Sequence, residues 1–507
     1  MILIVPSADA DAAFDVIRSV GVDDPRFSVR TWDEGVALEA TQVVDLVVGS
    51  LTGSHVMLLE SGAALTPEAI GWFRLGRDSA DLVYSDEFVV SGDSPTPVFK
   101  PAWSPTLAVL RNYVGSAVVV RNVVFHRVGG FGRGLHDLTL RMAASNITVC
   151  HLPNLLVERF GDDLPVCDTV ASSRVMRSRM CDAEVVCESD GRSVVQWHGR
   201  AAVSVKVVVP TRDRVELLRD AVESVLRARD VPNLSLVIVD NGSLESETLR
   251  YMAELLARDP RVSVIRDDGS FNFSRICNRG AAYGDDSDVT VFLNNDVSTK
   301  DRQWLRQLVG WFDAGHVGGV GARLEFPDGR VQHMGVVVER YRYSGNDISD
   351  GRLPIAVHAG HGLTSDKIAG TIFDSQREVS AVTAACLAVD TNTFHAVGGF
   401  DEALAVDFQD VDLCLRMVTH HDASLIYDCT VRLEHRESAS RGSVGASTSG
   451  TLAVMSERWA KVLEDSDPCF SPHVAFDLTT RPVRYVDQAE LARRISPRLS
   501  AGANLTR

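Results

Sequence analysis

The stretch that decides the fold is Val203-Ser-Val-Lys-Val-Val-Val209, followed by the polar turn Pro210-Thr-Arg-Asp-Arg214. The first seven residues are mostly β-branched and predict a buried strand. After the turn, apolar residues recur at helical spacing, at Leu217, Leu218, Ala221, Val222 and Val225. A strand, a short turn and a helix in this order are typical of a parallel α/β sheet.

The same pattern continues along the chain. The predicted elements are strands at 235–240, 262–265 and 289–293 and a helix through 249–256. Strands that alternate with helices imply a parallel sheet, and such sheets bind ligands beyond the carboxyl ends of their strands. Asp240 and Asp296 both fall at such ends.

Composition limits the class of protein. The chain has 507 residues, more than one hydrophobic core usually serves, so two or three domains are expected. Apolar residues make up 45% and charged residues 23%, which is a globular composition. The net charge is 51 − 68 = −17, and so acidic a protein is a poor candidate for sequence-independent nucleic-acid binding. No nucleic-acid partner is therefore expected.

The cysteine pattern and the N-terminal sequence indicate the cellular compartment of the protein. Nine cysteines are scattered without a CxxC pair, which fits neither a zinc framework nor a disulfide scaffold, so we expect buried thiols in a reducing compartment. The start, Met1-Ile-Leu-Ile-Val-Pro6, has no basic region and does not resemble a signal peptide. The sequence contains no run of about 18 apolar residues that would predict a membrane span. We expect a soluble cytoplasmic protein.

Four segments are predicted from the shifts in composition along the chain. They are an N-terminal domain at 1–161, a mixed polar linker at 162–202, the main α/β domain at 203–485 and a basic tail at 486–507.

Three short matches in the same order indicate an internal duplication. The pairs are Leu58-Leu-Glu-Ser-Gly62 with Phe292-Leu-Asn-Asn-Asp296, Val128-Gly-Gly-Phe131 with Val397-Gly-Gly-Phe400, and Asp137-Leu-Thr-Leu-Arg141 with Asp412-Leu-Cys-Leu-Arg416. Gly62 then stands in the place of Asp296, and Leu135 stands in the place of Asp410. The N-terminal copy therefore lacks two acids with candidate roles in chemistry.

Two strand ends carry candidate ligands for a nucleotide. Asp240 precedes Asn-Gly-Ser, and its carboxylate can accept an N–H group of a nucleobase, although capping of the turn is the alternative. Asn294, Asn295 and Asp296 follow another apolar strand. An acid beside amides suits a hard divalent cation held partly by diphosphate oxygens. The alternative there is again a polar turn.

A candidate general base lies further along the chain. Gln409-Asp-Val-Asp-Leu413 opens a predicted helix, and the helix dipole stabilises a carboxylate at Asp410 in its first turn. Asp410 can serve as a general base for an acceptor hydroxyl or merely cap the helix. Asp412, two residues on, points elsewhere and is expected to make a structural pair. His435 follows a strand-like stretch at 424–433, and a lone histidine is more often a structural hydrogen-bonding group than a ligand.

A basic segment completes the set of candidates. Phe271–Gly280 is predicted as a loop that runs into a helix, with Arg275 and Arg279 near the sheet edge. A guanidinium group can pair with a diphosphate. The alternative is a solvated helix start with an aromatic anchor.

The order of these motifs along the chain resembles their order in a known protein family. From 208 to 442 the chain contains, in sequence, Val-Val-Pro-Thr-Arg-Asp-Arg, Val-Asp-Asn-Gly-Ser, Phe-Asn-Phe-Ser-x-x-x-Asn-Arg-Gly-Ala, Leu-Asn-Asn-Asp, Gly-Gly-Phe-Asp-Glu, Gln-Asp-Val-Asp-Leu-Cys-Leu-Arg and His-x-Glu-Ser-x-Ser-Arg-Gly. This order is similar to the inverting family 2 glycosyltransferases of GT-A fold, especially the bacterial O-antigen and rhamnosyltransferase-like group. The resemblance covers roughly residues 203–480, over half of the chain.

The resemblance implies a fold and a role for each matching residue. The implied fold is α/β, a C-terminal GT-A domain preceded by a degenerate, truncated GT-A-like domain without catalytic function. The implied nucleotide-sugar-binding residues are Pro210, Thr211, Arg212, Asp240, Asn272, Arg275, Asn278, Asn294 and Asn295. Asp410 is implied as the general base, and Asp296 and His435 as contacts of Mn²⁺ or Mg²⁺. Asn294 stands where the family's Asp-x-Asp element has its first acid. Thr383-Ala-Ala-Cys386 resembles the floor of the acceptor side.

The implied function is inverting transfer of a sugar from a nucleotide diphosphate sugar to a glycan or lipid-linked oligosaccharide of the cell envelope. Such an acceptor implies work at the inner face of the cell membrane, with peripheral membrane association. One alternative is a noncatalytic pseudo-transferase scaffold in an envelope-polysaccharide assembly complex. Another is a nucleotidyltransferase, which would favour a Gly-rich, Lys-bearing loop after the first strand, whereas Pro210–Arg214 has neither residue.

Overall fold

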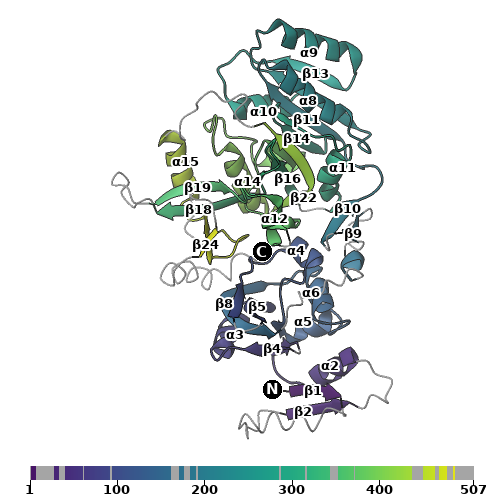
Figure 1. Cartoon of the computed structure of the whole chain (residues 1–507), viewed down its shortest axis with the longest axis vertical. Helices are drawn as coiled ribbons and strands as arrows, with labels where there is room; N and C mark the ends of the chain where they lie inside the picture. Colours follow the sequence, from purple (N-terminus) through teal and green to yellow (C-terminus); the bar gives the residue numbers. More distant parts are fainter. Residues whose placement is uncertain are drawn as a thin grey trace. The chain divides into compact units, whose positions relative to one another are not determined.

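The chain divides into two compact units (Figure 1). The computed structural model describes residues 2–6, 28–32, 40–60, 62–91, 94–160, 171–175, 183–189, 192–284, 287–314, 317–342, 352–369, 371–436, 449–462, 467–476 and 483–485. Unit 1 comprises Met1–Val98 and Val114–Ala171, and unit 2 comprises Phe99–Tyr113 and Ser172–Arg507. The predicted tail at 486–507 lies outside the described residues, as does Glu437–Gly442 of the last motif.

Unit 2 is built on one large mixed sheet. Its strand order is β13 (Val262–Arg266), β12 (Leu234–Asp240), β11 (Val205–Thr211), β14 (Val289–Leu293), β21 (Cys386–Asp390), β16 (Val317–Glu325), β22 (Ser424–His435) and β15 (Val297–Ser298). The first four strands are parallel, as the sequence predicts. β21 then runs antiparallel to both β14 and β16. Two short strands, β17 (Val331–His333) and β20 (Arg377–Glu378), pair with β16 and β22.

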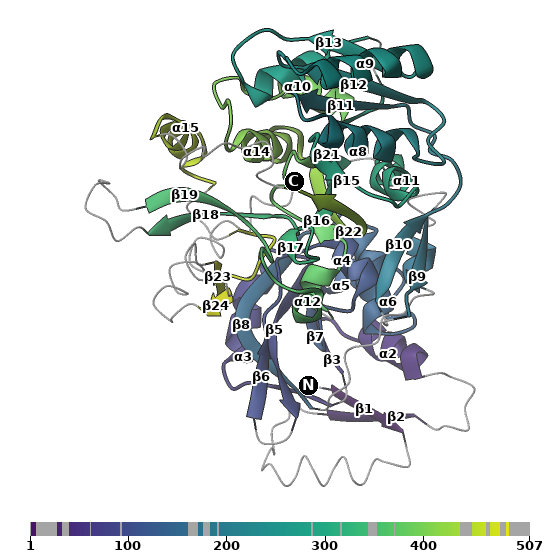
Figure 2. The ribbon, with the colours of Figure 1, turned by 45° about the horizontal axis from the view of Figure 1, so that its top comes forward.

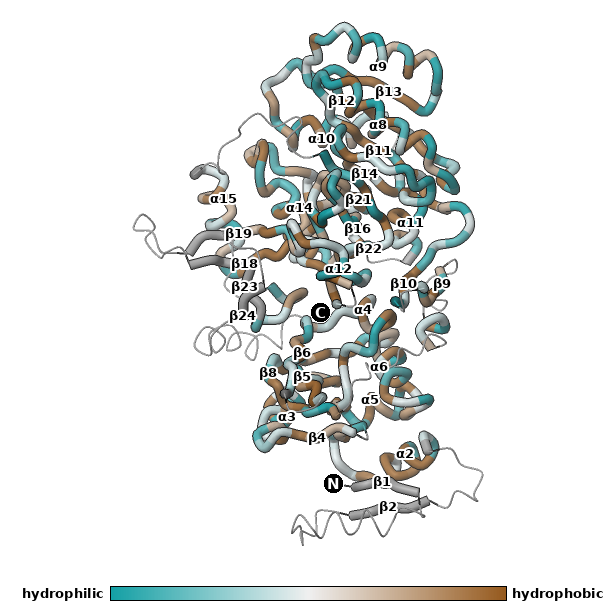
Figure 3. Tube along the Cα trace, viewed as in Figure 1, coloured by the Kyte–Doolittle hydropathy of each residue, from teal (hydrophilic) through white to brown (hydrophobic). Residues whose placement is uncertain are grey.

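Helices cover this sheet and fill the connections between strands. Figure 2 shows α8 (Val215–Leu226), α9 (Ser246–Arg258) and α10 (Phe273–Ala281) beside the parallel strands. Figure 3 shows hydrophilic and hydrophobic stretches alternating along α9, as expected of a helix that packs one face on a sheet. The other described elements of unit 2 are α4 (Pro105–Leu110), β9 (Ala183–Cys187), β10 (Ser193–Trp197), α11 (Trp304–Gly310), η2 (Trp311–Ala314), β18 (Val336–Arg342), β19 (Arg352–His358), α12 (Ser365–Ile368), η3 (Ile372–Asp374), α13 (Thr391–Ala396), α14 (Gln409–His421), α15 (Ser449–Trp459), β23 (Val474–Phe476) and β24 (Val483–Tyr485).

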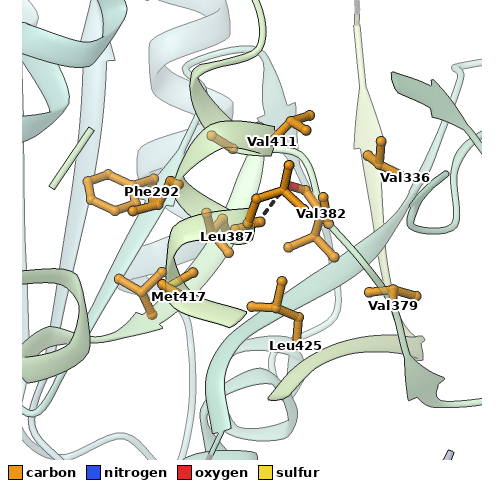
Figure 4. Close-up of a cluster of buried hydrophobic side chains, with 14 of the residues drawn as sticks. Phe292, Val336, Val379, Val382, Leu387, Val411, Met417 and Leu425 are labelled. Atoms are coloured by element: carbon orange, nitrogen blue, oxygen red, sulfur yellow. Dashed lines mark hydrogen bonds between the residues drawn. The ribbon is translucent and has the colours of Figure 1, made fainter. Parts of the chain in front are cut away.

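The main core lies between the sheet and α14. Phe292 of β14 and Leu387 of β21 are fully buried, and Val411 and Met417 of α14 belong to the same cluster (Figure 4). Four of the nine cysteines, Cys277, Cys386, Cys414 and Cys429, are buried free thiols, which agrees with the expected use of cysteine in the core. Burial raises the pKa of the Cys414 thiol to about 12. Because Val411, Cys414 and Met417 of α14 are buried in this core, α14 is fixed against the strands whose ends carry the predicted site.

Part of the predicted linker belongs to unit 2. β9 and β10 form an antiparallel hairpin between Ala183 and Trp197. The Trp197 ring lies 5.6 Å from the Trp311 ring in an edge-to-face arrangement, and Gln307 bonds both the N–H and the C=O of Trp197. This half of the 162–202 segment is thus packed structure.

Unit 1 repeats the second half of the large sheet. Its strands run in the order β3 (His55–Leu59), β7 (Ala117–Arg121), β5 (Leu82–Ser91), β8 (Val149–Phe160) and β4 (Ala63–Leu65), with β6 (Ser94–Val98) paired to β5. This order and every strand direction match β14, β21, β16, β22 and β15, with β17 in the place of β6. The other described elements of unit 1 are β1 (Ile2–Pro6), parallel to β2 (Ser28–Trp32), α2 (Ala40–Gly49), α3 (Ala69–Arg77), α5 (Asn122–Arg127) and α6 (Leu135–Ala143).

Individual contacts repeat as well. Arg141 of α6 bonds Asp137 at 3.0 Å and the Val128 carbonyl at 2.5 Å. Arg416 of α14 bonds Asp412 at 2.8 Å and, in the same way, the Val397 carbonyl at 2.6 Å. The shared topology and these matched contacts support the internal duplication predicted from the sequence.

Close packing of α10 on the sheet gives a test of the fold. A Cβ atom on Gly280 would collide with Val208 of β11 and Val239 of β12. We expect Gly280→Ala to lower the free energy of unfolding by about 1–3 kcal/mol, since a well-packed core resists added atoms. Gly71 of α3 has open space around it, so Gly71→Ala should stabilise the protein by about 0.5–1 kcal/mol. Urea unfolding of both variants checks this contrast, and equal effects would contradict it.

Candidate functional site

The carboxyl ends of the parallel strands form one edge, as predicted. Thr211, Asp240 and Arg266 are direct neighbours across β11, β12 and β13. Asp240 is buried; its Oδ1 accepts a hydrogen bond from Ser243 N at 2.9 Å and its Oδ2 accepts one from Arg266 at 2.5 Å. The capping of the Asn-Gly-Ser turn, one of the two roles considered for Asp240, is therefore present in the structure.

The loops after β11 and β12 are joined by Asp213, which was not among the candidates from sequence. Its carboxylate accepts hydrogen bonds from Leu244 N at 2.7 Å and Glu245 N at 2.9 Å. Asp213 and the next residue, Arg214, adopt left-handed backbone with φ of 55° and 60°. Such conformations are unfavourable for residues other than glycine and cluster at functional sites. Asp213 thus joins the loop after β11 to the loop after β12. Pro210 lies near the end of β11, and the exposed Arg212 follows this strand.

A buried aspartate organises the predicted basic segment. Asp267 accepts hydrogen bonds from Arg275 and Arg279, each at 2.9 Å, and its own N–H bonds the Asp240 carbonyl. Burial alone would raise the pKa of Asp267, but the hydrogen bond from Arg275 and those from Gly269 N and Arg279 outweigh it and lower this pKa. Asp267, whose backbone is bonded to Asp240, therefore holds the Arg275 guanidinium near the end of β13.

Asn272 and Asn278 hold α10 against the Gly-Gly-Phe-Asp-Glu segment. Asn272 caps α10 by accepting a bond from Arg275 N at 3.0 Å, and it donates to the Glu402 carbonyl at 2.8 Å. Asn278 exchanges two hydrogen bonds with the Phe400 backbone, both at 2.9 Å. The amide groups of these two predicted donor-binding residues are thus engaged within the protein.

Asp296 and His435 lie together at the end of β14. Their Oδ1 and Nε2 atoms are 3.2 Å apart, and the other ring nitrogen of His435, Nδ1, lies 2.7 Å from Oε1 of Gln332. β15 pairs Val297 with His435, which brings residues more than a hundred positions apart to one point. Gln332 was not a candidate from sequence. Within the described residues, no group of three or more His, Cys, Asp or Glu side chains lies together, so Asp296 and His435 form a pair and not a larger cluster.

Asp410 lies in the first turn of α14, as predicted. Its Oδ2 accepts a hydrogen bond from Ala384 N at 3.0 Å and its Oδ1 accepts one from Val411 N at 2.9 Å. The residue before the helix, Phe408, has a left-handed φ of 63°, which is rare for a bulky residue. The carboxylate is thus fixed on the Thr383–Cys386 segment.

Three short contacts join these groups into one site. Asn295 donates a hydrogen bond to the Thr211 hydroxyl at 3.0 Å. Asn294 N bonds the Ala385 carbonyl at 3.0 Å, and the neighbouring Ala384 holds Asp410. The ends of β11 and β14, the start of β21 and the start of α14 therefore meet, which brings together the predicted donor, metal and base residues of these elements.

Asp412 makes the structural pair that its position predicts. It is fully buried and accepts hydrogen bonds from Arg416 at 2.8 Å, Arg458 at 2.7 Å and the Trp459 indole at 3.0 Å. The last two residues belong to α15, so this carboxylate fastens α15 to α14.

Comparisons with known proteins indicate a family for part of the chain. Residues 206–367 match the family model described as "Glycosyl transferase family 2". These residues form a family 2 glycosyltransferase domain. The predicted fold class, with a further α/β region before this domain, is confirmed. None of the helices in the described ranges combines the length and hydrophobicity that crossing a membrane requires.

Two curated relatives match most of the chain. An uncharacterized protein, y4gI of Sinorhizobium fredii, is 30% identical over 499 residues, which cover 91% of this chain and 53% of the relative. The O-antigen biosynthesis protein RfbC of Myxococcus xanthus is 30% identical over 452 residues, which cover 84% of this chain and 34% of the relative. The chain therefore spans about half and about a third of these two proteins.

Solved structures of glycosyltransferases are more distant. GalNAc-T7 with UDP, GalNAc and Mn²⁺ has a TM-score of 0.39 and 15% identity, with 52% of this chain and 50% of that chain covered. The mannosyltransferase PcManGT of Pyrobaculum calidifontis with GDP-Man and Mn²⁺ has a TM-score of 0.37 and 13% identity, with 60% and 70% covered.

The Asp412 cluster yields a test of what holds the site together. We expect Asp412→Ala to lower the free energy of unfolding by about 3 kcal/mol, because removing one partner leaves the guanidinium groups of Arg416 and Arg458 without their buried acceptor. Asp401 is the more exposed partner of Arg458, and Asp401→Ala should cost about 1 kcal/mol or less. Urea denaturation followed by circular dichroism measures both values. Similar losses in the two variants would contradict the assigned role.

Proposed function

We propose that unit 2 is an inverting glycosyltransferase. It moves a sugar from a nucleotide diphosphate sugar to a hydroxyl of a cell-envelope glycan or lipid-linked oligosaccharide. The observation that carries this proposal is the junction in which Asp410, held by Ala384, adjoins the loop after β14, where Asp296 contacts His435 of β22. The family 2 domain supports the reaction class, and the O-antigen relative supports the acceptor class.

The donor would bind along the edge formed by β11, β12 and α10. The proposed contacts are Pro210, Thr211, Arg212, Asp240, Asn272, Arg275, Asn278, Asn294 and Asn295. The guanidinium of Arg275 suits a diphosphate, since Asp267 fixes it while its side chain stays partly exposed. Asp240 has one hydrogen bond on each carboxylate oxygen, and each oxygen has a second lone pair for a donor N–H.

Asp296 and His435 fit a divalent cation, Mn²⁺ or Mg²⁺. Their 3.2 Å separation is near the roughly 3 Å between adjacent ligands of an octahedral ion with bonds of about 2.0–2.1 Å. Two protein ligands suffice, because such ions usually keep other oxygen ligands, including those of substrate phosphates. Bound there, the ion would neutralise charge on the leaving diphosphate.

Asp410 would act as the general base. Ala384 N and Val411 N hold the carboxylate at the start of α14, where it can take the proton of an acceptor hydroxyl. The acceptor oxygen attacks the anomeric carbon from the face opposite the diphosphate, the bond to the diphosphate breaks, and the configuration inverts. This single displacement needs no protein nucleophile.

Unit 1 would be a noncatalytic copy. Gly62 and Leu135 replace Asp296 and Asp410, and neither can ligate a cation or accept a proton. Arg159 takes the place of His435, because it pairs with Ala63 as His435 pairs with Val297. We propose that unit 1 serves acceptor placement or assembly, and that the protein works in the cytoplasm in peripheral contact with the membrane. A pseudo-transferase scaffold is the alternative function for the whole chain.

The base assignment is tested by Asp410→Asn. This variant keeps a hydrogen-bond acceptor but not a proton acceptor, so turnover should fall by about 10²–10⁴ with donor affinity unchanged. Transfer is measured with radiolabelled nucleotide sugars and envelope glycan acceptors. Asp401→Asn is the control and should transfer normally.

Residual transfer near the parental rate would remove Asp410 from the mechanism. Transfer at half the parental rate would reveal a second working centre in unit 1. A parent protein that binds acceptor glycans but transfers no sugar from any donor would favour the scaffold.

The metal assignment is tested by Asp296→Ala. Loss of one of two protein ligands should abolish the Mn²⁺-dependent part of the affinity for nucleoside diphosphates, and calorimetry with and without Mn²⁺ measures it. Asp301→Ala, at an exposed acid five residues further on, is the matched control and should bind as the parent does. Equal Mn²⁺ dependence in Asp296→Ala and the parent would disprove the assignment.

A further inference from the structure

An irregularity in strand pairing places Gln332 beside His435. β17 pairs with β16 through Leu324–His333 and Glu325–Val331, so two successive residues of β16 face residues that are two positions apart. Gln332 is the extra residue between them. Such bulges break the regular register and redirect a side chain, and they are common next to active sites.

The redirected side chain ends at the imidazole. Gln332 is buried, with 1% of its surface exposed, and its Oε1 lies 2.7 Å from Nδ1 of His435. An amide oxygen only accepts hydrogen bonds, so Nδ1 carries the hydrogen. In the neutral ring the lone pair is then on Nε2, the atom that faces Asp296 at 3.2 Å.

The duplicated unit provides an internal comparison. β6 and β5, the counterparts of β17 and β16, pair residue for residue from Glu87–Val98 to Ser91–Ser94. No residue of this ladder corresponds to Gln332, and Arg159 replaces the histidine. The purely structural pair is kept in both units, as Asp137–Arg141 and Asp412–Arg416. The bulge is thus absent where Asp296 and His435 are absent, although the surrounding fold and its structural contacts are retained.

We propose that Gln332 is a positioning residue for His435. It fixes the ring orientation and keeps the Nε2 lone pair directed to the point shared with Asp296, where a divalent cation would bind. This inference rests on the proposed metal site and adds a residue to it. Partners of this kind, which hold the second nitrogen of a ligating histidine, set its tautomer and basicity.

The experiment compares Mn²⁺ binding by variants of Gln332 in the full chain. The loss of free Mn²⁺ signal in electron paramagnetic resonance gives the affinity directly and does not depend on turnover. Gln332→Met fills the same space without an acceptor and should weaken Mn²⁺ binding about 10–100-fold, the usual effect of removing such a partner. Gln332→Asn shortens the side chain by one methylene, which moves the acceptor oxygen away from His435, and should also weaken Mn²⁺ binding. Gln332→Glu keeps an acceptor in place and should retain binding.

Gln376→Met is the matched control. Gln376 is equally buried, but its amide bonds the Val195 backbone and Asp428 in another part of unit 2. Its replacement should lower the melting temperature without changing Mn²⁺ affinity. If Gln332→Met does not fold, Gln332→Asn and Gln332→Glu carry the comparison.

The outcomes separate this inference from the function on which it rests. A parent that does not bind Mn²⁺ would refute the proposed metal site itself. A parent that binds Mn²⁺, with folded Gln332→Met and Gln332→Asn binding equally well, would overturn the role of Gln332 alone. Equal losses in Gln332→Glu and Gln332→Met would likewise overturn it, because they would show a packing effect.

Discussion

The antiparallel course of β21 between β14 and β16 is the constraint on which the candidate site depends. Because β21 runs against β14, its first residues lie where β14 ends, and Ala385 accepts the hydrogen bond of Asn294 N there. The adjacent Ala384 then holds the Asp410 carboxylate. The segment before β21, which lies some ninety residues after Asn294, thus holds the candidate base of α14 at the edge where the parallel strands end.

Residues at strand ends could be predicted from sequence, whereas contacts between distant segments could not. Asp240 and Asp296 follow β-branched runs, and Asp410 and Asp412 follow from the helical pattern, so local rules suffice for them. Gln332 lies 103 positions from His435 and depends on a bulge, which no local pattern reveals. Asp213 and Asp267 resemble ordinary polar loop residues until the structure shows their partners. Asn272 and Asn278 were assigned to the donor, yet their amides also join α10 to the 400–402 backbone.

The two units share one architecture but differ at the positions of the proposed site residues. Strand order, strand direction and the arginine–aspartate pair of α14 persist in unit 1, where α6 carries the pair. These features stabilise the fold whatever the protein does. The residues that differ, Gly62, Leu135 and Arg159, stand at the positions of Asp296, Asp410 and His435. In the proposed function, activity thus resides in a few side chains placed on a common scaffold.

The two aspartates of α14 owe their different roles to helical spacing. Residues two positions apart point to different sides of a helix, so Asp412 turns into the interior while Asp410 faces the sheet edge. The Asp412 carboxylate accepts hydrogen bonds from two guanidinium groups and an indole, so its role is structural. Among the described residues, Asp410 bonds only to backbone N–H groups, and these leave each oxygen a further lone pair. The proposed role of Asp410 as a base requires this second arrangement, because a proton acceptor needs a lone pair that fixed donors do not occupy.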